Sequence, residues 1–351
     1  MENKVRIDDV RAALSHVMDP ELGADLVSLD MIRNIAIKGD TIAFDLVLTT
    51  PACPLKKVLS DNCTAAIAQY ISPDYKVEIN LTSSKPAQAA TDLGELRNVR
   101  HIIAVASGKG GVGKSTVAAN LALALAKSGK KVALVDADIY GPSIPTMFGL
   151  ENVQPQGVQE GEKTLLLPIE KYGIKLISIG FFVEADKGLL WRGPMASNAL
   201  KQLFTETRWG EIDYMVVDLP PGTGDIHITI VQTMPVSGVV MVSSPQQVAI
   251  ADVKRAAQMF QAVKVPMLGM VENMAWFVPS DMPDKKYYIF GKGACEEYAA
   301  RMGYPVLAQI PMTEATAMSG DAGMPEVLKD GSPVGKAFME LAQKVMELRN
   351  C

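Results

Sequence analysis

The most constraining stretch of this chain runs from Gly108 to Thr116 and reads Gly-Lys-Gly-Gly-Val-Gly-Lys-Ser-Thr. It fits the pattern G-x-x-x-x-G-K-[ST], in which glycines let backbone N–H groups converge on phosphate oxygens. An apolar run at residues 102–106 precedes it, and a helical pattern rich in alanine and leucine follows at residues 117–128. A strand, a glycine-rich loop and a helix in this order indicate a phosphate-binding loop, because the helix N-terminus adds its positive dipole end.

The residues of this loop take different roles in the predicted site. We expect Lys114 to neutralise the β- and γ-phosphates of a nucleotide and the Ser115 hydroxyl to ligate Mg²⁺. A glycine-rich turn with a solvated lysine is the alternative. The residues expected to bind the nucleotide are Gly108, Lys109, Gly110, Gly111, Val112, Gly113, Lys114, Ser115 and Thr116.

Length, charge and cysteine content exclude several classes of protein. A chain of 351 residues favours two unequal domains. A net charge of −5 gives no electrostatic reason for binding nucleic acid or anionic lipid. Residues 1–4 show no secretory signal, and no apolar run approaches the roughly 18 residues of a membrane span. The cysteines form no C-x-x-C pair, so we expect neither a disulfide framework nor a zinc site, and a reducing cytoplasm as the location.

The N-terminal part of the chain, residues 1–82, is predicted to form a small α+β domain. A helical pattern follows Asp8, a candidate N-cap. Alternating apolar residues on both sides of Gly39-Asp40 predict a hairpin, a second helical pattern follows Pro54, and residues 77–81 predict a last strand. Residues 83–98 lack an apolar period and are predicted to be a flexible linker.

Two cysteines of the small domain differ in their surroundings. Cys53 follows Thr50-Pro51-Ala52 and precedes a predicted helix, whose dipole would lower the thiol pKa and make a thiolate ligand available. The alternative is that Cys53 is a small buried apolar residue, as cysteines commonly are. Cys63 lies inside the helical pattern and is expected in the core.

The remainder, residues 99–351, alternates strand and helix patterns. This order predicts an α/β domain whose mostly parallel sheet is covered by helices on both faces, and ligands of such sheets bind at the carboxyl ends of the strands. The predicted strands are Ile102–Ala106, Val132–Val135, Ile174–Ile179, Tyr214–Val217, Val239–Ser243, Met267–Val271 and Val306–Ile310.

Acidic residues follow two of these strands. Asp136 and Asp138 come after the second, and Asp218 follows the fourth, before a glycine-rich turn that could sense a γ-phosphate. An acid at a strand end beside a phosphate loop is the usual partner of Mg²⁺, and Asp218 fits that role. Of Asp136 and Asp138, one could support the metal site while the other orients the attacking water. Each carboxylate alone could instead cap a helix or form a turn.

Other polar residues carry weaker signals. Asn273 follows the strand that ends at Val271 and could read adenine through its amide, or form a turn. The histidines, His16, His101 and His227, are scattered, and none is assigned a catalytic or metal-binding role.

The large domain carries a second lysine, Lys109, in the phosphate loop, which is the deviant form K-G-G-x-G-K-[ST]. With its other motifs, this domain closely resembles the Mrp-type (ApbC-like) ATPases, which are cytoplasmic iron–sulfur cluster carriers of the MinD/ParA group. The small domain resembles the iron–sulfur assembly-associated domain through Asp19-Pro20-Glu21 and the Cys53 segment. The other matching segments are Asp136–Ser143, Trp191–Met195, Asp218–Asp225 and Glu272–Met274.

The resemblance implies a P-loop NTPase that hydrolyses ATP with Mg²⁺ as a nucleotide-dependent homodimer. Lys109 would cross to the ATP of the partner subunit, much as an arginine finger does. Lys114 and Asp138 would support hydrolysis, which leaves Asp136 beside Asp218 at the Mg²⁺ site, and Asn273 would contact adenine. The implied partners are iron–sulfur scaffold proteins and apo-client proteins.

The sequence departs from the family where relatives commonly carry C-x-x-C, shortly after Met274. Residues 275–287 contain no cysteine, and serine or aspartate replaces a thiolate poorly around the iron of a [4Fe–4S] cluster. Cys53 remains the candidate ligand. A spatial-organising ATPase of the MinD/ParA kind is the alternative function, but the mixed charges of the last helical pattern, residues 333–349, do not favour surface binding.

Overall fold

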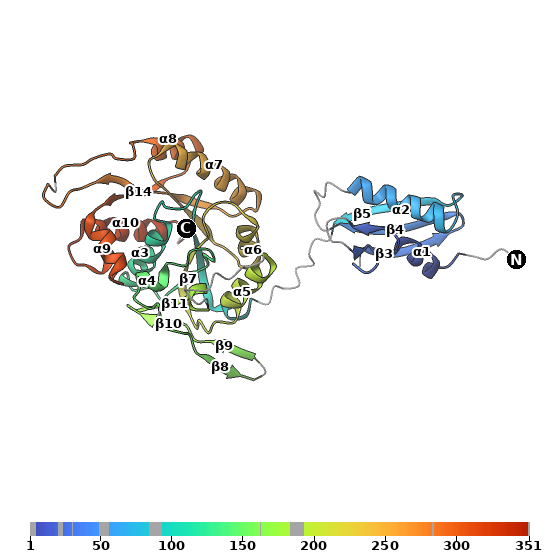
Figure 1. Ribbon diagram of the computed structural model, residues 1–351, viewed down its shortest axis with the longest axis horizontal. Helices are drawn as coiled ribbons and strands as arrows, with labels where there is room; N and C mark the ends of the chain where they lie inside the picture. The colour runs from blue at the N-terminus through green and yellow to red at the C-terminus, as the bar shows by residue number, and fades with distance from the viewer. Residues whose placement is uncertain are drawn as a thin grey trace. The chain divides into compact units, whose positions relative to one another are not determined.

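The computed structural model describes residues 5–19, 24–29, 31–48, 56–83, 93–161, 163–182, 193–282 and 284–349. Within the chain, Met1–Thr91 and Asp92–Cys351 form two separate units (Figure 1). Each unit buries its own set of apolar side chains, so each is described by itself.

The smaller unit is a three-stranded sheet with two helices. Strands β3 (Ile32–Lys38) and β4 (Thr41–Leu48) form the predicted antiparallel hairpin, and β5 (Lys76–Ser83) pairs in parallel with β4. Gly39 makes the tight turn with a φ of 61°, which glycine adopts without strain. The helices are α1 (Ile7–Leu14) and α2 (Lys56–Tyr70), and a short pair, β1 (Met18–Asp19) and β2 (Ala24–Asp25), completes the unit.

Two predictions for this unit have different outcomes. Cys63 lies fully buried in the core, as expected. The N-cap prediction is wrong, because α1 begins after Arg6, and Asp8 lies in the first turn. Asp9, rather than Asp8, reaches back, and its carboxylate accepts a hydrogen bond from the Arg6 backbone N–H at 2.9 Å.

The larger unit is built on an eight-stranded sheet within the described residues, with the order β10-β11-β7-β12-β6-β13-β14-β15. All neighbouring strands are parallel except the edge pair of β10 and β11. The central strands are buried on both sides, which explains their nearly continuous apolar sequences. The strands are β6 (Val99–Ser107), β7 (Val132–Asp136), β10 (Ile169–Lys171), β11 (Ile174–Ser178), β12 (Ile212–Asp218), β13 (Gly238–Ser243), β14 (Met267–Phe277) and β15 (Val306–Met312).

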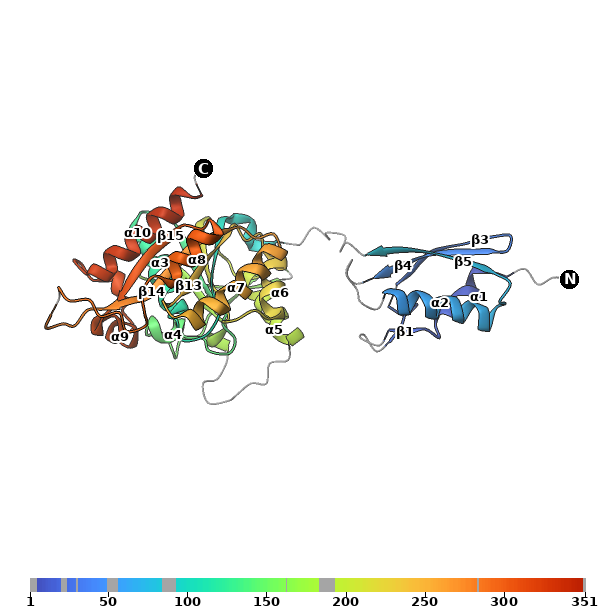
Figure 2. The same cartoon turned by 90° about the horizontal axis from the view of Figure 1, so that it is seen from above.

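Helices cover both faces of this sheet, as predicted (Figures 1 and 2). One face carries α3 (Lys114–Lys127), α4 (Ile144–Met147), α9 (Glu314–Asp321) and α10 (Pro333–Glu347). The other carries α5 (Gly193–Thr205), α6 (Asp225–Thr233), α7 (Gln247–Ala262) and α8 (Ala294–Met302). In the part of the chain that the structure describes, no helix has both the length and the apolar character needed to cross a membrane.

A crevice is expected where neighbouring strands send their following helices to opposite faces. Strands β6 and β12 are such neighbours, because β6 continues into α3 and β12 into α6. Their register places Asp218 beside Val105 of β6 and, on the other side, beside Asp136 of β7. The phosphate loop and two of the predicted acids therefore meet at the switch point of the sheet.

The structure differs from the predicted elements in three places. Residues 94–98, predicted to belong to the flexible linker, form a short 3-10 helix, η1 (Gly94–Asn98), whose Leu96 is buried in the core of the larger unit. Strand β14 does not end at Val271 but continues to Phe277, because Asn273 pairs with Ile310 and Phe277 with Met312 of β15. A hairpin of β8 (Gly157–Glu160) and β9 (Lys163–Leu166), with the edge strand β10, was not predicted. These short segments have no extended apolar run, which is the signal that marks the buried strands.

Candidate functional site

The loop between β6 and α3 has a backbone that requires glycine at its fixed positions. Gly113 has a φ of 79°, and a Cβ there would collide with the Asn273 side-chain amide. A Cβ on Gly108 would collide with the Asp252 backbone of α7. The Ser107 hydroxyl donates a hydrogen bond to the Lys109 carbonyl at 2.9 Å. Glycine therefore lets this loop pass close to two neighbouring segments.

Lys114, the first residue of α3, lies among groups from three separate segments. Its Nζ is 2.6 Å from Asp218 Oδ1 at the end of β12 and 3.4 Å from Asp138 Oδ2 in the loop after β7. The same Nζ is 3.2 Å from the Ser115 hydroxyl. Lys114 is only 6% exposed, and both carboxylates are buried. The structure thus brings four of the predicted site residues together.

Asp136 organises the loop that carries Asp138. Its Oδ1 accepts the Asp138 backbone N–H at 3.1 Å. Its Oδ2 accepts the Ile144 backbone N–H at 3.2 Å and the Ser178 hydroxyl at 3.0 Å. Burial and the neighbouring charge of Asp218 raise the pKa of Asp136 to about 7. Both oxygens of Asp136 are thus used within the protein.

The site carries an excess of negative charge. When ionised, Asp136, Asp138 and Asp218 place three carboxylates around the single ammonium of Lys114. Burial raises the pKa of Asp218, although Lys114 opposes the shift. Among the residues that the structure describes, the buried oxygens Asp218 Oδ2 and Asp138 Oδ1 have no hydrogen-bond partner. An added divalent cation would balance this charge and use oxygens that now lack partners.

Two further predicted residues make contacts outside this cluster. The Lys109 Nζ lies 3.5 Å from the Gln246 side-chain oxygen, at the N-cap of α7. The Asn273 amide donates a hydrogen bond to the Val112 carbonyl at 2.8 Å, so this residue supports the phosphate loop.

His227, to which the sequence assigned no role, holds the loop that follows Asp218. Its Nδ1 accepts the Gly224 backbone N–H at 3.2 Å, and its Nε2 lies 2.8 Å from the Pro220 carbonyl. Burial lowers the pKa of His227. The sequence feature that could have indicated this role is the position of His227, because the third residue of a helix can reach back to the N-cap N–H.

The cysteines that the structure describes do not offer thiolates. Cys63 and Cys295 are fully buried, and burial raises the pKa of each thiol to about 12. Cys53, together with Pro20, Glu21, Trp191 and Arg192 of the matching segments, lies outside the described residues. Among the residues described, no three His, Cys, Asp or Glu side chains are arranged to hold a metal ion by themselves. Mg²⁺ at Asp218 would therefore depend on the Ser115 hydroxyl, phosphate oxygens and water for its other ligands.

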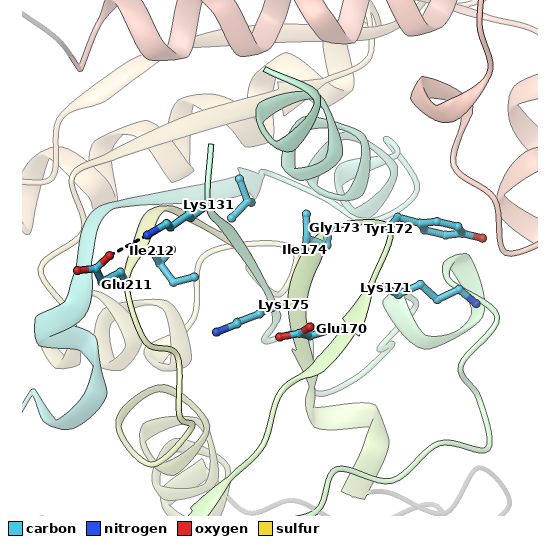
Figure 3. Close-up of a pocket in the computed structure, with 10 residues that line it drawn as sticks. Lys131, Glu170, Lys171, Tyr172, Gly173, Ile174, Lys175, Glu211 and Ile212 are labelled. Carbon is cyan, nitrogen blue, oxygen red and sulfur yellow. Dashed lines mark hydrogen bonds and ion pairs between the residues drawn. The ribbon is translucent and has the colours of Figure 1, made fainter. Parts of the chain in front are cut away.

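A pocket of about 500 Å³ lies at the opposite end of the sheet (Figure 3). It opens where β7, β11 and β12 begin, and the Lys131 ammonium bonds the Glu211 carboxylate at its edge at 2.7 Å. Lys175 also lines it, and its Nζ donates to the Trp209 carbonyl at 2.8 Å. Because ligands of parallel sheets bind at the carboxyl ends of the strands, this pocket is separate from the phosphate site.

Known proteins are similar to this chain in sequence and in fold. An iron–sulfur cluster carrier protein of Synechocystis sp. is 44% identical over 342 residues, covering 96% of each chain. A nucleotide-binding protein of Archaeoglobus fulgidus, solved in complex with ADP, is 38% identical with a TM-score of 0.58, covering 67% of this chain and 91% of that one. The cell-division ATPase MinD of Pyrococcus furiosus, at 21% identity and a TM-score of 0.51, covers 71% of this chain and 99% of its own and shares the fold.

Family models match both parts of the chain. The model of an iron–sulfur cluster assembly protein matches residues 7–81. The ParA model, described as the NUBPL iron-transfer P-loop NTPase, matches residues 98–346, which include the phosphate loop and the acids around Lys114. The α/β architecture and the expected resemblance are thereby confirmed, and the chain belongs to the family of NUBPL iron-transfer P-loop NTPases.

Proposed function

We propose that this protein binds and hydrolyses ATP with Mg²⁺ and that it carries or assembles iron–sulfur clusters as a nucleotide-dependent homodimer. The observation that carries the nucleotide part is the buried Lys114 ammonium between Asp218 and Asp138 at the switch point of the sheet. The family match supports the cargo, and it favours this function over a spatial-organising ATPase of the MinD/ParA kind. The cytoplasm is the proposed location.

The phosphates would bind along the backbone from Gly108 to Gly113 and at the N-terminus of α3. Lys114 would exchange its contacts with Asp218 and Asp138 for contacts with the β- and γ-phosphates. This exchange requires another cation at the acids, since they would otherwise lose their compensating charge.

Mg²⁺ fits this requirement. The proposed ligands are the Ser115 hydroxyl and Asp218, whose Oδ2 has no hydrogen-bond partner in the described part of the chain. Asp136, assigned to Mg²⁺ from the sequence, would affect the ion without binding it directly. Its oxygens already accept hydrogen bonds that hold the loop of residues 137–144. When bound, Mg²⁺ would neutralise charge that develops on the transferred phosphoryl group.

Asp138, Lys109 and Asn273 keep the roles proposed from the sequence. The buried Oδ1 of Asp138 has no hydrogen-bond partner within the described ranges, which suits it to accept a hydrogen bond from the attacking water. Lys109, whose only side-chain hydrogen bond among the described contacts is the 3.5 Å one to Gln246, would reach the ATP of the partner subunit. Asn273 would contact adenine from its place beside Val112.

The iron–sulfur cluster is the proposed cargo of this protein. Burial disfavours Cys63 and Cys295 as thiolate ligands, and the other two cysteines, Cys53 and Cys351, lie outside the described residues. Cys53, in the segment that resembles the assembly domain, is the proposed ligand of a [4Fe–4S] cluster. Iron–sulfur scaffold proteins and apo-client proteins are the proposed partners, by analogy with the named relatives.

Anaerobic cluster reconstitution tests the cargo. Wild type, Cys53→Ala and the control Cys295→Ala are loaded with iron and sulfide, and iron content and visible absorbance are measured. We expect wild type and the control to load, and Cys53→Ala to lose the cluster. If wild type takes up no iron, the proposed cargo is wrong. If Cys53→Ala loads as wild type does, Cys53 is not the ligand.

A further inference from the structure

We propose that His227 is a positioning residue, which holds the glycine-rich loop after Asp218 in the conformation that supports hydrolysis. The inference rests on the proposed ATPase function and adds to it a residue that binds neither nucleotide nor metal.

The hydrogen bonds of His227 close the loop on itself. The ring accepts the Gly224 N–H at one nitrogen and meets the Pro220 carbonyl with the other, so a single side chain joins both ends of the turn. Since a carbonyl only accepts, Nε2 carries the proton and Nδ1 is the acceptor. His227 is 2% exposed, so water does not compete for these bonds.

The same loop is tied to β6, the strand that leads into the phosphate loop. The Leu219 N–H donates to the Val105 carbonyl at 3.1 Å, and the Gly222 N–H donates to the Ser107 carbonyl at 3.0 Å. Gly222 adopts a φ of 91°, which glycine alone adopts readily. The loop is therefore anchored to β6 at its start and by His227 across its span. Loosening the His227 anchor would free the segment next to Asp218 and leave Lys114 in place.

Protonation of His227 would break the anchor. A protonated ring would present a second N–H to the Gly224 N–H, and the two donors would oppose each other. The charged groups that act on the ring are Lys114 of α3, which disfavours the proton, and Asp138 of the loop after β7, which favours it. Burial is the larger effect and keeps the ring neutral.

The test compares His227→Gln and His227→Leu with wild type. Glutamine offers one acceptor and one donor group, so it can replace both bonds without titrating, whereas leucine can replace neither. We expect His227→Leu to lower ATP turnover by about tenfold to a hundredfold, as for two lost buried hydrogen bonds, with ATP affinity within about threefold of wild type. His227→Gln should recover most of this turnover. The control is Gln232→Leu, a polar-to-apolar change at an exposed position of the same helix.

Acidification gives a second readout. Burial lowers the pKa of His227, so its ring gains a proton only in acid. Since only wild type can protonate residue 227, the turnover of His227→Gln relative to wild type should rise as the pH is lowered. The proposal would be overturned if His227→Leu hydrolysed ATP as fast as wild type, or if His227→Gln were as slow as His227→Leu.

Hydrogen exchange separates this proposal from the proposed function. In the peptide that spans residues 219–231, the amides should exchange at least about tenfold faster in His227→Leu than in wild type and His227→Gln. If wild type hydrolyses no ATP, the proposed function fails, and the exchange still decides whether His227 holds the loop. Equal exchange in all three proteins would refute the anchor directly.

Discussion

Removing the ammonium of Lys114 is the most informative perturbation of this site. In Lys114→Ala, Asp136, Asp138 and Asp218 remain buried, and the cation that contacts Asp138 and Asp218 is lost. Breaking a buried ion pair in this way costs about 3–5 kcal/mol. For a unit of this size, 1 kcal/mol changes Tm by about 2–4 °C, so we expect Tm to fall by roughly 6–20 °C near pH 8.

The loss should depend on pH in a direction that the acids determine. The pKa of Asp136 is raised from 3.8 to about 7. Keeping this carboxyl ionised in the folded protein therefore costs on the order of 4 kcal/mol relative to the unfolded chain. Asp136 binds its proton more tightly in the folded protein than in the unfolded chain. Its contribution to the free energy of unfolding is therefore largest below about pH 4 and is lost as the pH rises through 7. Lys114 lowers the pKa values of Asp136 and Asp218, so its removal raises both. In Lys114→Ala the free energy of unfolding therefore continues to fall at a higher pH than in wild type. The difference between wild type and Lys114→Ala should therefore grow from pH 5 to pH 8.

Thermal unfolding at several pH values, with and without Mg·ATP, measures both effects. At a hundred times Kd, the nucleotide should stabilise wild type by about 2.7 kcal/mol, and it should not stabilise Lys114→Ala. Lys254→Ala, an exposed lysine on α7, is the control for the loss of a charge. A variant as stable as this control at pH 8, or a loss that does not change with pH, would refute the electrostatic argument. Unchanged ATP affinity would refute the phosphate-site assignment.

Three further predictions concern the loop and its metal. Lys109→Ala should keep ATP affinity but lose hydrolysis, measured as phosphate release, and an unaffected rate would argue against a site shared between subunits. Asp218→Asn should weaken the Mg²⁺ dependence of ATP binding by about tenfold or more, measured by titration calorimetry with and without EDTA. Gly113→Ala should lower Tm by several degrees, because φ is 79° and the Cβ meets the Asn273 amide, whereas Gly110→Ala, with nothing within 4 Å, should not.

The phosphate loop and the buried strands could be predicted because their signals are local. Gly108, Gly113 and Lys114 have fixed spacing, and long apolar runs mark strands that are buried on both faces. The end of β14 could not be predicted, because it depends on pairing with β15, more than thirty residues away in sequence. The N-cap of α1 was predicted at Asp8 but is Arg6, because the sequence does not distinguish Asp8 from Asp9. Only the backbone geometry brings the Asp9 carboxylate to the Arg6 N–H.

The sequence by itself determined the kind of site: a phosphate loop, acids at the ends of parallel strands, and no C-x-x-C pair after Met274. Tertiary structure alone decided how these groups act on one another. Asp136 and Asp218 become neighbours through strand register, and Lys114 is held between carboxylates that lie 24 and 104 residues away. The role of His227 also depends on the fold, since burial keeps its ring neutral and a turn brings Pro220 and Gly224 to its two nitrogens. Charge and hydrogen bonding depend on distance in space and on exclusion of water, and only the folded chain sets these.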